Sequence, residues 1–269
     1  MWRCVMMLSR TRRRPRNFED ELMIDVSEEG GVRKLHFGSD DTQSAMKINA
    51  PNELLLAYSR CVFGSLLFLD PPQKMLLIGL GGGSIAKWVH EYLPTTHLTC
   101  VELFQQVVNV WRARCFFLPP DDARLEVITG DGAAHVYNMA DESVDMIMMD
   151  AYSATGIAAP LASTDFFTAC KHKLTDNGVL AVNLWSIDRR FEQYCAQLSE
   201  VFEGRLICLP ARQKGNVIAF AFMRGQNNPQ WERLADKAKK LEAEYGLEFN
   251  EFVSDLARMN PHNDRRLFI

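Results

Sequence analysis

From Lys74 onward, five apolar segments alternate with amphipathic segments along this chain. The apolar segments are MLLIG, HLTCVEL, RLEVITGD, VDMIMMDAY and GVLAVNLW, and apolar residues in the segments that follow them recur every three or four positions. Strands this uniformly apolar are typical of a parallel sheet covered on both faces, and helical connections supply that cover. The pattern therefore predicts an α/β fold with a doubly wound, mostly parallel sheet.

The segments on either side of this alternation predict simpler elements. Residues 19–51 contain three short alternating segments, two of them joined at Gly30 and Gly31, and predict a small antiparallel β domain. Residues 52–269 are then the α/β domain, which we expect to begin with a helix over NELLLAYSRCVFGSLLF. Later in the chain, RLICLPA and NVIAFAFMRG predict an antiparallel pair at the sheet edge, and WERLADKAKKLEAEY predicts a helix near the end of the chain.

The opening segment and the composition restrict the classes of function. In residues 1–18 a run of arginines follows a short apolar stretch, which is the wrong order for a signal peptide or an anchor. We expect a disordered tail there, with a nucleic-acid-binding arm as the alternative. The formal net charge of -4 argues against general binding to nucleic acid or to a membrane surface.

Cysteine and histidine spacings predict a reduced, metal-free protein of the cytoplasm. The seven cysteines include no C-x-x-C pair, and several lie in apolar segments, so we interpret them as reduced core residues. The six histidines show neither H-x-H nor H-x-x-x-H spacing, so no metal site is predicted.

A glycine-rich turn, GLGGGS over residues 79–84, follows the first apolar strand. Glycines let the backbone approach a ligand closely, and the helix after the turn offers free N–H groups and the positive end of its dipole. The ligand crevice of a doubly wound sheet lies at such a turn. We therefore expect Gly79, Gly81 and Gly82 to border a ligand, with a purely structural turn as the alternative.

Acidic residues stand at the ends of the next strands. Glu102, followed by Leu103, is placed to accept both hydroxyls of a ribose, with a solvated carboxylate as the alternative. Asp131, followed by Gly132, suits hydrogen bonding to the exocyclic amine of adenine, with a helix cap as the alternative. Asp150 ends the fourth strand. We expect all five residues to contact a nucleoside.

An acidic edge beside a glycine turn favours one class of nucleoside. Carboxylates suit a neutral ribose and a cationic sulfonium better than they suit a pyrophosphate. The predicted ligand is therefore S-adenosylmethionine or a close relative. A nicotinamide oxidoreductase remains the alternative of different chemistry, although Ser84 breaks the G-x-G-x-x-G fingerprint.

In order and spacing, these segments resemble the polyamine aminopropyltransferase family, that is, spermidine synthase and its relatives. The resemblance covers about residues 33–185 and rests on DDTQSAM, KMLLIGLGGGS, CVEL, ITGDG and VDMIMMDAYS. It implies a Rossmann-like S-adenosylmethionine-dependent transferase fold behind an N-terminal β domain, a small-molecule amine acceptor and assembly as a homodimer. It also implies that Gln43 contacts the nucleoside, that Glu102 and Asp131 bind ribose and adenine, and that Asp150 is the first acid of the family's D-x-x-D segment.

Three positions at the substrate end depart from the family pattern. Aligned without a gap, Gly82 stands where the family has an Asp beside the aminopropyl end of the donor. Ser153 stands at the second acid of D-x-x-D, which orients and deprotonates the amine, and the family's Tyr-Gln pair is Tyr58-Ser59 here. The expected catalytic positions are therefore Tyr58, Asp150 and Ser153, with a serine whose pKa is too high for it to serve alone as the base.

These departures leave the reaction open. Three alternatives stay open. The chain transfers an aminopropyl group in an altered site, transfers a methyl or other group, or binds an S-adenosyl ligand without catalysis. An acid at position 82 would repel the carboxylate of intact S-adenosylmethionine and favour decarboxylated S-adenosylmethionine. Gly82 therefore leads to the hypothesis that this chain accepts or prefers the intact donor. Asp165 is the nearest downstream replacement for the missing carboxylate, with a helix cap as its alternative role. The acceptor is not predicted, because the loop TGIAAPLAS carries no interpretable pattern.

Overall fold

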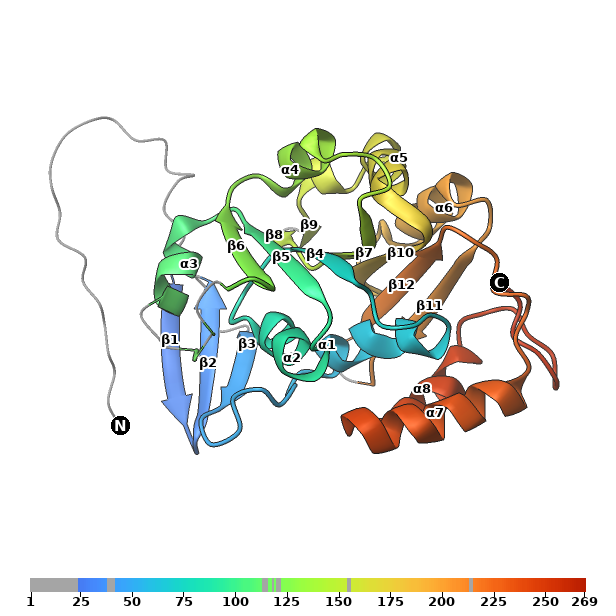
Figure 1. Ribbon diagram of the computed structural model, residues 1–269, viewed down its shortest axis with the longest axis horizontal. Helices are drawn as coiled ribbons and strands as arrows, with labels where there is room; N and C mark the ends of the chain where they lie inside the picture. Colours follow the sequence, from blue (N-terminus) through green and yellow to red (C-terminus); the bar gives the residue numbers. More distant parts are fainter. Residues whose placement is uncertain are drawn as a thin grey trace, which may run out of the picture.

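Seven strands form a central sheet in the order β11-β12-β10-β7-β4-β5-β6 (Figure 1). The computed structural model describes residues 24–37, 42–112, 116, 117, 119, 122–153, 156–212 and 215–269, so the tail predicted over residues 1–18 lies outside the described residues. The strands of the central sheet are β4 (Lys74–Ile78), β5 (His97–Glu102), β6 (Leu125–Thr129), β7 (Val144–Met149), β10 (Leu174–Trp185), β11 (Leu206–Pro210) and β12 (Asn216–Phe222).

The pairing of these strands confirms the predicted doubly wound, mostly parallel sheet. Strands β10, β7, β4, β5 and β6 run parallel to one another. Strand β12 pairs antiparallel with both β10 and β11, which confirms the antiparallel pair predicted at the edge. The chain runs outward from β4 through β5 to β6 and then returns to β7 on the other side of β4. Ligands of such sheets bind at this reversal, beyond the carboxyl ends of the strands.

Helices cover both faces of the sheet (Figure 1). One apolar cluster joins the sheet to α1 (Ala57–Cys61), the 3-10 helix η1 (Val62–Leu67), α2 (Ser84–Tyr92), α3 (Gln105–Arg112), α7 (Trp231–Tyr245) and α8 (Phe249–Leu256). A second cluster joins the opposite face to α4 (Gly132–Asn138), α5 (Thr164–Lys173) and α6 (Phe191–Val201). The two clusters account for the uniformly apolar strands, since each strand buries side chains in both directions.

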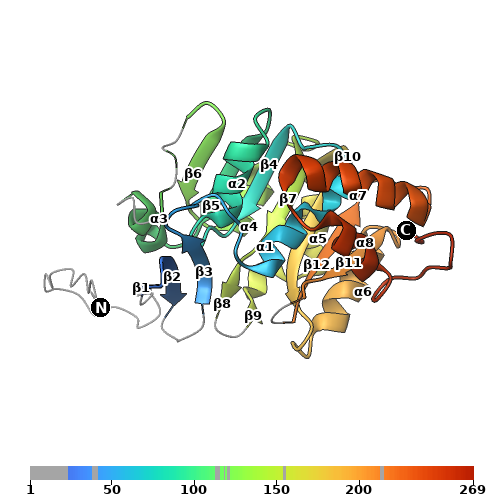
Figure 2. The same ribbon diagram turned by 90° about the horizontal axis from the view of Figure 1, so that it is seen from below.

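A separate three-stranded antiparallel sheet precedes the α/β core. It consists of β1 (Ile24–Glu29), β2 (Val32–Phe37) and β3 (Thr42–Lys47). Gly30 and Gly31 form the turn between β1 and β2 with positive φ angles. The β2–β3 register shifts at Gln43, which is the extra residue of a β-bulge. This sheet lies beside α2 (Figure 2).

The helix predicted over residues 52–68 is wrong in extent. Only α1 is α-helical there, and η1 continues it as a 3-10 helix. Two carbonyl oxygens that a longer helix would use, those of Leu54 and Leu55, instead accept hydrogen bonds from Arg60 Nη1 at 3.0 and 2.9 Å. The Ser59 hydroxyl similarly donates to the Leu56 carbonyl. These local side-chain bonds compete with helical hydrogen bonds.

A hairpin of two-residue strands, β8 (Tyr152–Ser153) and β9 (Gly156–Ile157), follows β7 and leads into the 3-10 helix η2 (Ala159–Leu161).

No helix within the described part of the chain is both long and apolar enough to cross a bilayer.

Candidate active site at the carboxyl edge of the sheet

Gly79 lies at the point where β4 and β7 end side by side. Its φ is +89°, and a Cβ atom built on it would lie less than 3.0 Å from the backbone carbonyl of Asp150. Any other residue would therefore be strained and would force the two strand ends apart. Glycine at this position keeps the ends of β4 and β7 in contact at the reversal of strand order.

The rest of the glycine loop is covered by the N-terminal sheet. The Gly82 N–H donates to the Ser44 hydroxyl oxygen at 2.8 Å. A Cβ atom at Gly82 would lie 2.7 Å from Ser44 Cβ and 3.2 Å from the ring of Phe116. The space where an acidic side chain would begin is therefore filled by two residues from other segments.

Glu102 is buried at the end of β5, with 6% of its surface exposed. Its Oε2 atom accepts the Leu80 N–H at 2.9 Å, and its Oε1 atom accepts the Phe104 N–H at 3.0 Å. Burial raises the pKa of this carboxyl group, and the backbone N–H groups partly oppose that rise. The alternative of a solvated carboxylate is therefore wrong. Its contact with a ribose stays a prediction.

Asp131 caps helix α4. Its Oδ1 atom accepts the N–H groups of Ala133 and Ala134 at 2.7 and 3.0 Å, which is the capping role left open as the alternative. Gly132 begins α4 against the side chain of Ile78 in β4, where a Cβ atom would clash. The close approach brings α4 to the same edge as the glycine loop. Binding of adenine by Asp131 stays a prediction.

Leu103 and Gln43 lie at the borders of this edge. Leu103 follows Glu102 and is 56% exposed, so its side chain is accessible to a ligand. Gln43 is half-buried in β3. Its neighbour Ser44 lines the pocket described below, while Gln43 itself is not part of that lining.

Asp150 is the carboxylate at the centre of the edge. Asn183 Nδ2 donates to its Oδ1 atom at 2.8 Å, and the Tyr58 hydroxyl also hydrogen-bonds to its side chain. Burial raises the pKa of Asp150 to about 6, these two hydrogen bonds lower it, and the charge of Glu102 adds to the rise. A carboxyl group with such a pKa is ionised at neutral pH yet close to taking up a proton.

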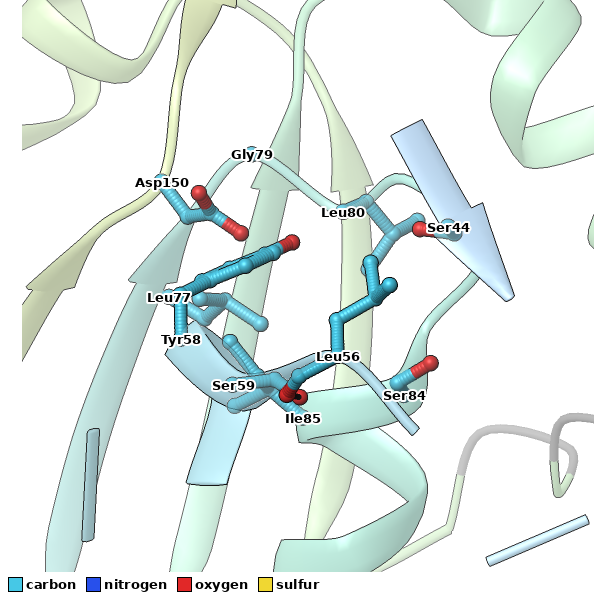
Figure 3. A pocket seen from close by; sticks show the side chains of 10 residues that line it. All are labelled: Ser44, Leu56, Tyr58, Ser59, Leu77, Gly79, Leu80, Ser84, Ile85 and Asp150. Carbon is cyan, nitrogen blue, oxygen red and sulfur yellow. Dashed lines mark hydrogen bonds between the residues drawn. The ribbon is translucent and has the colours of Figure 1, made fainter. Parts of the chain in front are cut away.

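A small pocket lies beside Asp150. Figure 3 shows the Tyr58 ring extending from α1 toward Asp150, and Gly79 of the glycine loop lies beside Asp150. The structure thus brings Tyr58, Gly79 and Asp150 together around this pocket, and their roles in binding and catalysis stay predictions. The complete lining is Ser44, Leu56, Tyr58, Ser59, Leu77, Gly79, Leu80, Ser84, Ile85 and Asp150.

The helix that carries Tyr58 is held from its other side. Arg60 Nε lies 2.6 Å from Glu248 Oε1, next to the start of α8. Both side chains are about a quarter exposed, and Arg60 also donates to two backbone carbonyls. This combination fixes the position of α1 more firmly than an exposed ion pair would.

Two asparagines of the site were not predicted. Asn183, near the end of β10, and Asn216, at the start of β12, are 3% and 7% exposed. The polar residue in the apolar segment GVLAVNLW is a signal that points to Asn183. No comparable signal points to Asn216, because it reaches the site only through the antiparallel pairing of β12 with β10.

The remaining predicted positions lie farther along the chain. Ser153 is in β8, where its backbone pairs with Gly156. Asp165 does not cap α5, because Ser163 does so by accepting the Phe166 N–H at 3.1 Å, and Asp165 lies exposed in the first turn. In the described ranges, no group of three or more His, Cys, Asp or Glu side chains is arranged to hold a metal ion.

Residues 55–229 match the family model described as the spermine/spermidine synthase domain. The chain is 42% identical over 247 residues to a polyamine aminopropyltransferase of Chromobacterium violaceum, which covers 91% of this chain and 94% of that protein. A probable spermidine synthase from Corynebacterium glutamicum has a similar structure, with a TM-score of 0.66 and 19% identity over 87% of this chain and 91% of that one. A spermidine synthase in complex with the transition-state analogue AdoDATO gives a TM-score of 0.61 and 18% identity, over 87% of this chain and 88% of that one.

These matches confirm the predicted fold and the predicted family. The two solved structures share the Rossmann-like fold with this chain. The chain belongs to the spermine/spermidine synthase family.

Proposed function

We propose that this chain transfers an aminopropyl group from an S-adenosyl donor to a small-molecule amine. The observation that carries the proposal is the Asp150 carboxylate, which lies at the reversal of strand order between a donor amide and the Tyr58 hydroxyl. The similarity to a polyamine aminopropyltransferase over most of the chain supports the same reaction.

The donor lies along the glycine loop in this proposal. Glu102 accepts the ribose hydroxyls, and Asp131 accepts the adenine amine through Oδ2, the oxygen outside its two capping bonds. Leu103 packs against the base, while Gln43, Gly81, Gly82 and Gly132 border the nucleoside. A carboxylate at the far end, Asp150, favours the positive charge of the sulfonium. The AdoDATO complex of a spermidine synthase with the same fold supports such a donor.

Asp150 then accepts the proton that the acceptor must lose. An ammonium group has no free electron pair, so one N–H bond breaks before the nitrogen attacks. The nitrogen forms a bond to the carbon beside the sulfonium, the C–S bond breaks, and neutral methylthioadenosine leaves. Tyr58 and Asn183 hold the Asp150 carboxylate in place for this step. The second acid of the family's D-x-x-D segment is Ser153 here, so Asp150 acts without it.

A specific observation favours a second candidate, methyl transfer from the intact donor. The space for a side chain at Gly82 is filled by Ser44 and Phe116, so no acid at this position repels the donor's carboxylate. If the intact donor binds, the same amine attacks the methyl carbon instead, and S-adenosylhomocysteine leaves. A third possibility, binding without catalysis, requires that neither product forms.

Mass spectrometry of the products separates these functions. The protein is incubated with a four-carbon diamine and either decarboxylated or intact S-adenosylmethionine. Aminopropyl transfer gives methylthioadenosine and an acceptor extended by one aminopropyl group, whereas methyl transfer gives S-adenosylhomocysteine. D150N lowers the rate about 100-fold or more if Asp150 is the base. D236N, which removes an exposed carboxylate of α7, serves as the matched control and leaves the rate unchanged. Equal rates for the two variants would contradict the proposal.

We also propose that the enzyme works in the cytoplasm as a homodimer. The five cysteines in the described part of the chain are all free thiols, and all but Cys195 are buried, which suits a reducing compartment. Analytical ultracentrifugation tests the dimer, which predicts a mass near twice the 30.6 kDa of the chain.

A further inference from the structure

A hydrogen-bonded pair of buried asparagines stands behind Asp150. Asn216 Nδ2 donates to Asn183 Oδ1 at 3.0 Å, and Asn183 Nδ2 donates to Asp150 Oδ1 at 2.8 Å. The first bond crosses from β12 to β10, and the second crosses from β10 to the end of β7. Three strands of the sheet are thus joined by one line of side-chain amides that ends on the carboxylate.

The surroundings of this pair are apolar. Along the same face, Val179 and Ala181 of β10 and Ile218 and Phe220 of β12 belong to one buried hydrophobic cluster. Two amides on such a face contribute little net stability, because their mutual hydrogen bonds only offset the loss of water. Apolar side chains of similar size would serve packing equally well, so stability alone does not explain the pair.

The direction of the hydrogen bonds follows from the carboxylate. Ionised Asp150 can only accept, so Asn183 must turn its NH2 group toward Asp150. The carbonyl oxygen of Asn183 then points toward β12, where it needs a donor. Asn216 supplies that donor. If Asn183 turned over, its carbonyl oxygen would face the carboxylate, and two acceptors would oppose each other.

We propose that Asn216 is a positioning residue for Asp150, which acts by holding Asn183 in the one amide orientation that donates to the carboxylate. This inference rests on the proposed function for its role in the reaction, but the orientation itself does not depend on any substrate. Asn216 does not line the pocket beside Asp150, so it exerts its effect through Asn183.

The test uses the full chain without substrate. Carboxyl carbons of aspartate are labelled with ¹³C, and the Asp150 resonance, assigned by its absence in D150N, is followed from pH 4 to 8. The variants are N216L, which keeps the branching at Cγ without a donor, and N183L, which removes the direct bond. I218V, on the same face of β12, is the matched control for loss of packing. N216A replaces N216L if the leucine does not fit.

The proposal predicts an ordered set of titrations. The midpoint for Asp150 rises by about one pH unit in N183L and by a smaller but measurable amount in N216L or N216A, because the ionised form loses a donor. It stays at the wild-type value in I218V. A midpoint in N216L and N216A equal to that in I218V would overturn the proposal. Since no donor or acceptor is present, this result is independent of whether the enzyme transfers an aminopropyl group.

A kinetic measurement separates positioning from a general structural role. In the product assay, N216L lowers kcat about 10-fold and leaves the KM for the donor within 2-fold, because only the Asp150 end of the site is affected. I218V leaves both constants unchanged. A rise in KM for the donor with unchanged kcat would contradict a positioning role at Asp150.

Discussion

The Ser44 hydroxyl oxygen lies 2.8 Å from the Gly82 nitrogen and accepts its N–H, so a strand of the N-terminal sheet is bonded directly to the glycine loop. The sequence predicts a departure from the family pattern at position 82, and the fold leaves little room for a side chain there. Ser44 and the Phe116 ring occupy the volume that a side chain at this position would need.

Replacing Gly82 by aspartate is expected to destabilise the protein. Overpacking against Ser44 and Phe116 lowers the free energy of unfolding by about 1–3 kcal/mol, which urea denaturation measures. G225D is the control, since a Cβ atom at Gly225 meets no atom within 4 Å. The double variant S44G/G82D recovers part of the loss, because it removes the Cβ contact at 2.7 Å. Equal stability of G82D and G225D would show that Ser44 and Phe116 do not restrict the space beside Gly82.

The pH dependence of stability reports the ionisation of Asp150. Its pKa is raised to about 6 in the folded protein, so the folded state holds one more proton than the unfolded state between about pH 4 and pH 6. The contribution of this group to stability is therefore complete below about pH 4 and is lost as the pH rises through 6. D150N, which stays neutral, gains stability relative to the wild type over that window, by at most about 3 kcal/mol. Urea titrations at pH 4.5 and 7 that gave a constant difference would contradict a raised pKa.

The ionisation of Lys87 changes the stability of the fold with pH in the opposite direction. It is buried in α2, its Nζ atom donates to the Phe116 carbonyl at 2.9 Å, and burial lowers its pKa to about 7. The unfolded state then holds more protons than the folded state between about pH 7 and pH 10.5, so stability rises with pH in this window. K87M removes this dependence, and its stability relative to the wild type falls by roughly 2–4 kcal/mol between pH 7 and pH 9.5. Thermal or urea unfolding at the two pH values checks the sign, and a rise would refute it.

The Arg60–Glu248 pair is expected to matter for catalysis as well as for stability. E248Q loosens the hold on α1, lowers the free energy of unfolding by about 1–2 kcal/mol and lowers kcat, because Tyr58 loses its fixed position against Asp150. K239Q is the control, since Lys239 and Asp236 form a pair whose side chains are both about two-thirds exposed and contribute little. Product assays in which E248Q and K239Q had the same kcat would exclude this link.

Much of the site was predictable because it depends on order along the chain. Gly79, Glu102, Asp131 and Asp150 each stand at or just beyond the end of an apolar strand, and parallel strands place their carboxyl ends at one edge. The local pattern therefore locates these residues without any knowledge of packing.

The residues that were missed depend on contacts between distant segments. Asn216 reaches Asn183 through strand pairing, and Ser44 reaches Gly82 from another sheet. The predicted extent of the helix from residue 52 was wrong for a related reason. Arg60 bonds to the carbonyls before α1 and to Glu248 far along the chain, and periodicity carries no information about such partners.

A crystal structure of the protein with methylthioadenosine, the expected product, tests the central claim most directly. The account predicts ribose hydroxyls within hydrogen-bonding distance of Glu102, the adenine amine at Asp131 and the sulfur on the side of the pocket that holds Asp150. A nucleoside bound with its sulfur remote from Asp150, or bound outside the carboxyl edge of the sheet, would contradict it.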